Sequence, residues 1–152
     1  MSKNIEKIKL SWDEMCESCE DIVEKIKDTG VAIDTVVAIA RGGVIPGSII
    51  ARAINAKLQV IKASSYGEDN KRGDLEADTV FADGNVLLVD DICDSGNTLN
   101  HIERNAVPYS SNSKIYTSAI YYKPNKLHDP DFWSRILPND PPVWVIFPWE
   151  LD

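Results

Sequence analysis

The sequence predicts an α/β fold, with a central and mainly parallel sheet flanked by helices. Two apolar runs, residues 34–40 and 86–89, are typical of strands that are buried on both faces. Each run is followed by a short loop of glycine or small polar residues, which opens onto a helical pattern. At 152 residues the chain is long enough to bury a core, so we expect one domain over residues 1–152.

The composition excludes several classes of protein. With 43% hydrophobic and 26% charged residues, it is that of an ordinary globular domain. No apolar run reaches the length of a membrane span, and the first residues lack a signal-peptide core, so we expect no membrane association. A net charge of −8 argues against a nucleic-acid-binding surface. Three cysteines and two histidines make neither a disulfide framework nor a zinc site, which favours the cytoplasm.

The first helix has a clear start and end. Ser11 is placed to cap it, with Glu14 completing a capping box three residues later. The apolar face continues to about Lys27, and Gly30 ends the helix. Cys16 and Cys19 fall within it as small core or edge residues.

The strand at residues 34–40 runs into a tight turn that begins with Arg41 and Gly42. Its two glycines precede a helix predicted over residues 44–54, and the next strand is predicted over 58–63. An arginine at the mouth of such a turn is suited to bidentate contact with a phosphate. The turn is therefore a candidate anion site.

Residues 64–74 form a long polar loop with mixed charge. A loop of this length is either a plain solvated hairpin or a flap that closes over a substrate. If it is a flap, Lys71 and Arg72 bring positive charge to a bound anion.

The stretch from residue 86 carries the strongest chemical signal. Asp90 and Asp91 stand where the strand of residues 86–89 is expected to end, and the turn D-S-G-N-T at 94–98 opens a helix over about 97–106. Backbone N–H groups at such a turn suit a phosphate monoester. The paired carboxylates can accept hydrogen bonds from sugar hydroxyls or hold Mg²⁺ through water. Together they fit a ribose 5-phosphate.

The last third of the chain supplies a lysine and an aromatic segment. A strand is predicted over residues 114–122, and Lys123 with the proline after it ends that strand. Residues 127–142 are rich in Pro, Asp and Asn, so we expect them to be irregular. An aromatic strand over 143–150 follows.

These motifs, taken together, resemble those of the type I phosphoribosyltransferases, closest to the microbial xanthine-guanine and other 6-oxopurine enzymes. Four apolar residues, two acids, two spacers and D-S-G-x-T match the family's 5-phosphoribosyl-1-pyrophosphate (PRPP) signature, and R-G-G, S-S-Y, K-P and the terminal W-x-x-x-P-W-E also match. The resemblance covers nearly the whole chain. It implies a core over about residues 30–123, a hood from about 1–12 and 124–152, and a mobile flap over about 64–79.

The resemblance also implies an activity, in which phosphoribosyl passes from PRPP to N9 of guanine, xanthine or hypoxanthine with Mg²⁺ as cofactor. It makes Asp94 the general acid/base and gives Asp90 and Asp91 the ribose hydroxyls and the metal. The 5′-phosphate is assigned to Asp94, Ser95, Gly96, Asn97 and Thr98. The pyrophosphate is assigned to Arg41, Gly42, Lys71 and Arg72, with a cis peptide expected between Ala40 and Arg41. The purine is assigned to Lys123, which reads the 6-oxo group, Trp144, which stacks, and Val145, which offers its carbonyl.

Two other functions stay open. The first is a regulator that senses PRPP or a nucleotide with little turnover, although such a sensor needs no base pocket. The second is an enzyme for another acceptor, such as adenine or a pyrimidine, against which the ammonium of Lys123 argues, because it suits a 6-oxo acceptor. The expected partners are PRPP and a purine base, in purine salvage, and the family's habit implies a homodimer or homotetramer. The order of preference among the three 6-oxopurines stays open.

Overall fold

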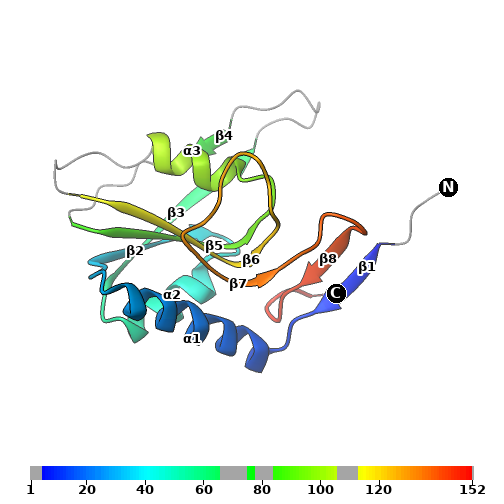
Figure 1. Ribbon diagram of the computed structural model, residues 1–152, viewed down its shortest axis with the longest axis horizontal. Helices are drawn as coiled ribbons and strands as arrows, with labels where there is room; N and C mark the ends of the chain where they lie inside the picture. Colours follow the sequence, from blue (N-terminus) through cyan, green and yellow to red (C-terminus); the bar gives the residue numbers. More distant parts are fainter. Residues whose placement is uncertain (1–4, 66–74, 78–83, 106–112, 152) are drawn as a thin grey trace.

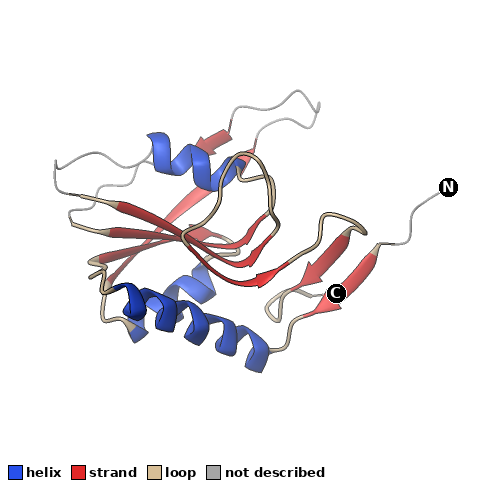
Figure 2. Cartoon of the chain, viewed as in Figure 1, coloured by secondary structure: helices blue, strands red, loops and turns tan. Residues whose placement is uncertain are grey.

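A computed structural model describes residues 5–65, 75–77, 84–105 and 113–151. Its main feature is a six-stranded sheet with the order β4-β3-β2-β5-β6-β7 (Figures 1 and 2). All neighbouring strands are parallel except β3 and β4, which are antiparallel. The strands are β2 Thr35–Ala40, β3 Lys57–Ser65, β4 Leu75–Ala77, β5 Val86–Cys93, β6 Ile115–Tyr122 and β7 Phe132–Ile136. This confirms the predicted α/β fold.

Helices cover both faces of this sheet. Helices α1 (Trp12–Thr29) and α2 (Val44–Ala53) lie on one face, and α3 (Asn97–Asn105) lies on the other (Figure 1). Alternate strand residues enter the two cores, so Leu87 packs in the core that contains α1 and α2, while Leu88 packs in the core that contains α3. Burial on both faces is why the central strands are continuously apolar.

The first helix follows its sequence signals closely. The Ser11 side chain accepts a hydrogen bond from the Glu14 backbone N–H, and the Glu14 side chain accepts one from the Ser11 N–H, so the capping box is present. Gly30 closes the helix in the left-handed conformation with φ of 74°. Cys19 is buried against Met15, and burial raises the pKa of its thiol to about 12.

A second, two-stranded sheet stands beside the main one. It pairs β1 (Glu6–Lys9) with β8 (Val143–Ile146) in parallel, so an early and a late segment of the chain lie side by side (Figure 1). The Leu10 backbone N–H donates to the Ile146 carbonyl at 2.9 Å and extends the pairing toward α1. We call β1, β8 and residues 147–151 the hood.

Three predicted boundaries were wrong. The aromatic strand predicted over residues 143–150 ends at Ile146. Strand β5 does not end before Asp90 but continues to Cys93, because its pairing with β6 extends over Asp90, Ile92 and Cys93. The segment 127–142 is not irregular throughout, since it contains β7. Strand β7 lies at the edge of the sheet, and only its first residue, Phe132, is buried. Because so little of the strand is buried, the sequence of β7 lacks the apolar pattern by which strands are predicted.

Two peptide bonds of the described chain are cis, and one of them precedes Arg41 of the predicted anion site. The peptide between Ala40 and Arg41 is cis, as the resemblance implied, and the Asp140–Pro141 bond is also cis. Within the described ranges, no helix combines the length and the apolar character needed to cross a membrane.

Candidate active site

The sheet brings the predicted site loops to one edge. Strand β2 is followed by the turn at Arg41, β5 by the turn at residues 94–98, and β6 by Lys123. Successive strands proceed outward from β2 in one direction and from β5 in the other, so these central neighbours mark the switch point of the sheet. In open parallel sheets ligands bind at the carboxyl ends of the strands at such a point.

The turn after β2 depends on its glycines. A Cβ added to Gly42 would overlap the Asp91 carboxylate, and one added to Gly43 would overlap the Val89 carbonyl oxygen. The Gly43 N–H donates to the Ile39 carbonyl at 2.8 Å, which draws the turn back onto β2. The Arg41 backbone is thereby held at the sheet edge while its side chain is exposed.

A cavity of about 870 Å³ opens beside this turn. Its lining combines the turn, the end of β3, one acid of β5 and the end of the hood: Ala40, Arg41, Gly42, Lys62, Ala63, Asp91, Trp149, Glu150 and Leu151. Two cations and two carboxylates therefore face a space large enough for a charged ligand. Sequence reasoning missed Lys62, whose register position beside Ala40 places it at this edge.

The turn after β5 encloses a second, smaller cavity of about 90 Å³. Its polar lining comes from Asp90, Asp94, Ser95, Gly96 and Thr98. The Asn97 N–H donates to Ser95 Oγ at 3.2 Å, and the Asn100 N–H donates to the Gly96 carbonyl at 3.0 Å as α3 begins. The turn thus lies at a helix N-terminus, a favourable place for an anion.

Asp90 and Asp91 are divided between these two cavities. Successive residues of a strand point to opposite faces, so Asp91 lines the larger cavity and Asp90 the smaller one. Burial, reinforced by the neighbouring Asp91, raises the pKa of Asp90 well above its usual range. The two adjacent acids are therefore not equivalent.

The donor set around Asp91 fits magnesium only in a limited way. In the described part of the chain, no group of three or more His, Cys, Asp or Glu side chains is placed to hold a metal ion. Mg²⁺ commonly takes one or two carboxylates and completes its shell with water and substrate phosphates. The site fits an ion that arrives with a phosphorylated ligand.

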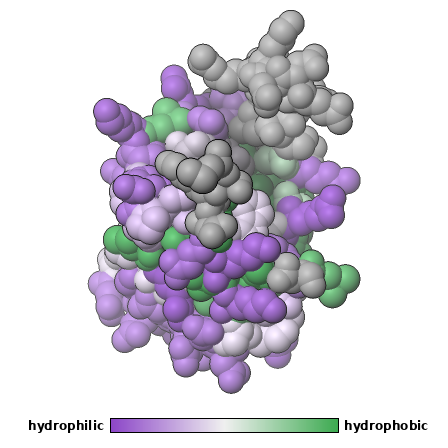
Figure 3. All heavy atoms as spheres, turned by 90° about the vertical axis from the view of Figure 1, so that its right-hand side faces the viewer, coloured by the Kyte–Doolittle hydropathy of each residue, from purple (hydrophilic) through white to green (hydrophobic). Residues whose placement is uncertain are grey.

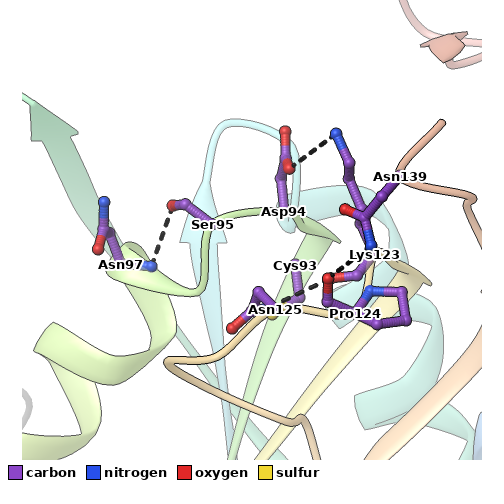
Figure 4. Close-up of polar contacts among 8 residues, drawn as sticks. All are labelled: Cys93, Asp94, Ser95, Asn97, Lys123, Pro124, Asn125 and Asn139. Atoms are coloured by element: carbon purple, nitrogen blue, oxygen red, sulfur yellow. Dashed lines mark hydrogen bonds and ion pairs between the residues drawn. The ribbon is translucent and has the colours of Figure 1, made fainter. Parts of the chain in front are cut away.

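Lys123 and Asp94 converge between the turn after β5 and the end of β6. Lys123 Nζ lies 3.4 Å from Asp94 Oδ1 (Figure 4). The Lys123 N–H donates to the Cys93 carbonyl at 2.9 Å, so the lysine backbone is joined to the end of β5. The sequence predicted both residues, and the structure brings them together.

The hood residues are placed differently. Trp144 on β8 is 60% exposed, whereas the Val145 side chain is buried, and both lie outside the two cavities described above. Trp149 enters the larger cavity, and its ring stacks on Phe147 at 4.8 Å with an interplanar angle of 9°. Figure 3 views the molecule from the side that carries the hood, where hydrophilic residues predominate and hydrophobic ones are scattered. The predicted flap cations, Lys71 and Arg72, lie outside the described residues.

These features define an α/β protein that presents polar turns at the switch point of its sheet. The chain matches the family described as "Phosphoribosyl transferase domain" over residues 4–152. It is 30% identical over 146 residues to a xanthine-guanine phosphoribosyltransferase of Desulfotalea psychrophila, covering 94% of this chain and 86% of that protein. It is 29% identical over 147 residues to a protein of the same name from Idiomarina loihiensis, covering 93% and 86%.

A solved structure supports the same assignment at the level of the fold. The purine phosphoribosyltransferase of Pyrococcus horikoshii superposes with a TM-score of 0.78 at 24% identity, covering 96% of this chain and 95% of that one. The chain belongs to the phosphoribosyltransferase family, and its fold is that of the type I enzymes.

Proposed function

We propose that this enzyme transfers the phosphoribosyl group of PRPP to N9 of a 6-oxopurine, giving a nucleoside 5′-monophosphate and pyrophosphate. The observation that carries the proposal is the approach of Lys123 Nζ to Asp94 Oδ1 at 3.4 Å, beside the turn at residues 94–98. A 6-oxopurine presents its O6 acceptor and its N7 on neighbouring positions. An ammonium donor and a carboxylate acceptor at this spacing suit that edge of the base.

The reaction breaks the bond from C1 of the ribose to the pyrophosphate oxygen and forms the bond from C1 to N9. Asp94 accepts the proton from N7 of the base, while Lys123 donates to O6 and stabilises the charge that develops there. The bonding electrons of the C1–O bond leave with pyrophosphate. Most of the rate enhancement is then expected from positioning and from charge stabilisation.

The two cavities would bind different parts of PRPP, the smaller one the 5′-phosphate and the larger one the pyrophosphate. Ser95, Gly96, Asn97 and Thr98 would bind the 5′-phosphate, with Asp90 beside it for a ribose hydroxyl. Arg41 and Gly42 would bind the pyrophosphate, together with Lys71 and Arg72 when a flap closes. Asp91, which lines the same cavity as Arg41 and Gly42, would hold Mg²⁺ on the PRPP. Bound there, Mg²⁺ would offset negative charge on the departing pyrophosphate.

The base is enclosed on its other sides by the hood. Trp144 would stack on the purine, which its exposure permits, and the Val145 backbone carbonyl would accept from a purine N–H. The names of the relatives support a guanine or xanthine substrate, and the proposal includes hypoxanthine. A cytoplasmic homodimer or homotetramer is part of the same proposal, and the free thiols of Cys16, Cys19 and Cys93 agree with a reducing compartment.

The experiment is a product analysis. The protein is incubated with PRPP, Mg²⁺ and, in separate reactions, guanine, xanthine or hypoxanthine, and the nucleoside monophosphate and pyrophosphate are quantified by chromatography. We expect the two products in equal amounts. If calorimetry detects PRPP binding but neither product forms, the protein is a sensor and the proposed activity is wrong.

A further inference from the structure

The loop that joins β6 to β7, residues 123–131, is folded around the side chain of Asn125. Its carboxamide contacts four groups, of which Cys93 and Lys123 are drawn in Figure 4. The oxygen accepts from two backbone N–H groups and the nitrogen faces two acceptors: Leu127 N at 2.9 Å, His128 N at 2.7 Å, Lys123 O at 3.2 Å and Cys93 Sγ at 3.8 Å. A carboxamide has two donor hydrogens and two acceptor lone pairs, so these contacts use its full capacity.

The backbone of Lys123 is consequently held at both of its polar groups. Its N–H donates to the Cys93 carbonyl, and its own carbonyl accepts from Asn125. Lys123 Nζ, at the far end of the side chain, reaches Asp94. Fixing the start of a long and flexible side chain lowers the entropy that is lost when its charged end binds.

Asn125 also rests on the turn at residues 94–98. A Cβ added to Gly96 would lie 2.8 Å from Asn125 Oδ1 and 2.9 Å from His128 Cβ, closer than real Cβ atoms approach. Gly96 has φ of 83°, so the close approach and the backbone conformation both require glycine there. The loop that carries Lys123 therefore packs directly on the turn proposed to bind the 5′-phosphate.

We propose that Asn125 is a positioning residue for base recognition. It sets the Lys123 side chain against Asp94 and holds the lysine loop on the turn at 94–98, so that the base pocket and the phosphate site keep one relative geometry. This inference rests on the proposed function. Asn125 acts through Lys123, whereas a residue that only stabilises the loop would affect every substrate and the unfolding temperature alike.

A double-mutant cycle with Lys123 separates these roles. We expect Asn125→Ala to lower kcat/KM for guanine by about tenfold, with KM for PRPP changed by less than about threefold. In a Lys123→Ala background the same change is expected to cost less than about twofold, because the group through which Asn125 acts is gone. Additive losses in the two backgrounds would overturn the proposal.

Asn139 provides a matched control. Its Nδ2 donates to the Pro124 carbonyl at 3.0 Å, so Asn139→Ala also removes an amide donor to the same loop, but one that contacts Pro124 and not Lys123. We expect it to leave kcat/KM for guanine within about twofold of the wild-type value. A loss equal to that of Asn125→Ala would mean general loosening of the loop and would contradict a specific role for Asn125.

A second variant covers the case in which Asn125→Ala does not fold. Asn125→Asp keeps the oxygen that accepts from Leu127 N and His128 N, but it removes the donor to the Lys123 carbonyl. We expect a near wild-type melting temperature with about the same tenfold loss for guanine. Wild-type kcat/KM in this variant would overturn the proposal.

The failure of this inference can be told from failure of the proposed function. If wild-type protein is active and the cycle is additive, only the role of Asn125 is wrong. If wild-type protein has no turnover, the same cycle is measured on GMP binding by calorimetry. Non-additive losses there would support the positioning role, and additive losses or no GMP binding would overturn it.

Discussion

Asp94 and Lys123 differ in how firmly the fold holds them. The Asp94 side chain is 67% exposed and that of Lys123 only 26%, and the Lys123 N–H is bonded to the Cys93 carbonyl. The lysine is therefore preorganised, while the carboxylate has room to follow a proton on an incoming ligand. This division suits Lys123 for recognising the base and Asp94 for moving the proton.

Replacement of Asp94 by Asn keeps the shape of the side chain and removes its ability to accept a proton. We expect Asp94→Asn to lower kcat by about 10²- to 10⁴-fold, the usual worth of general acid–base catalysis. Affinity for PRPP, measured by calorimetry, should stay within about threefold, because backbone N–H groups supply much of that site. Normal turnover by this variant would remove Asp94 from the mechanism.

Lys123 is the residue expected to select the 6-oxo group. Lys123→Ala should weaken kcat/KM for guanine and hypoxanthine by about tenfold to a hundredfold, as expected for loss of one hydrogen bond from a charged donor. Lys126, an exposed lysine in the same loop, gives the control, and Lys126→Ala should have little effect. Equal steady-state constants for the two variants would contradict the assignment of Lys123.

At the level of elements, the parallel pairing of β2 with β3 gives the larger cavity a second cation. Lys62 lies at the register position beside Ala40 and lines the cavity together with Arg41. We expect Lys62→Ala to raise KM for PRPP by about tenfold and to leave KM for guanine nearly unchanged. Lys57→Ala, at the other end of β3, is the control. A rise in KM for guanine without a rise in KM for PRPP would contradict the assignment of Lys62 to PRPP binding.

The capping box of α1 makes the stability of the protein depend on pH. Backbone and side-chain hydrogen bonds with Ser11 lower the pKa of Glu14 below its ordinary value of 4.5. Because the pKa is lower in the folded state, the stability from Glu14 is present above pH 4.5 and is lost as the pH falls through the folded-state pKa.

Glu14→Ala should therefore lower the melting temperature at pH 7, and its difference from wild type should shrink below pH 4.5. Thermal unfolding followed by circular dichroism at several pH values measures this. Glu17→Ala on the same helix is the control for a change in helix propensity, since Glu17 is exposed. A difference that stays constant with pH would show that the carboxylate charge is not involved.

For the molecule as a whole, the sequence predicted those features that are set by local chemistry. The cap at Ser11, the glycine turn after β2 and the turn at residues 94–98 each follow from a few neighbouring residues. Features that depend on the pairing of strands far apart in the sequence were not predicted, or were predicted with wrong boundaries. Asp90 and Asp91 have low strand propensity, yet β6 keeps them in β5.

The same distinction applies to the site. Lys123 and Asp94 were predicted as single residues, but their approach depends on the parallel register of β5 and β6. Nothing local marks Lys62 or Asn125, because a lysine near a strand end and an asparagine in a loop are common on protein surfaces. Their positions became informative only once the sheet and the loop 123–131 were built.

The central claim is that Lys123 and Asp94 form a site for a 6-oxopurine, and its most direct test is the choice of base. Initial rates are measured spectrophotometrically with PRPP, Mg²⁺ and each of guanine, xanthine, hypoxanthine and adenine. We expect turnover of at least one 6-oxopurine and none of adenine, since the 6-amino group of adenine is a donor that faces the lysine ammonium. Turnover of adenine at a rate comparable to that of the 6-oxopurines would contradict the claim.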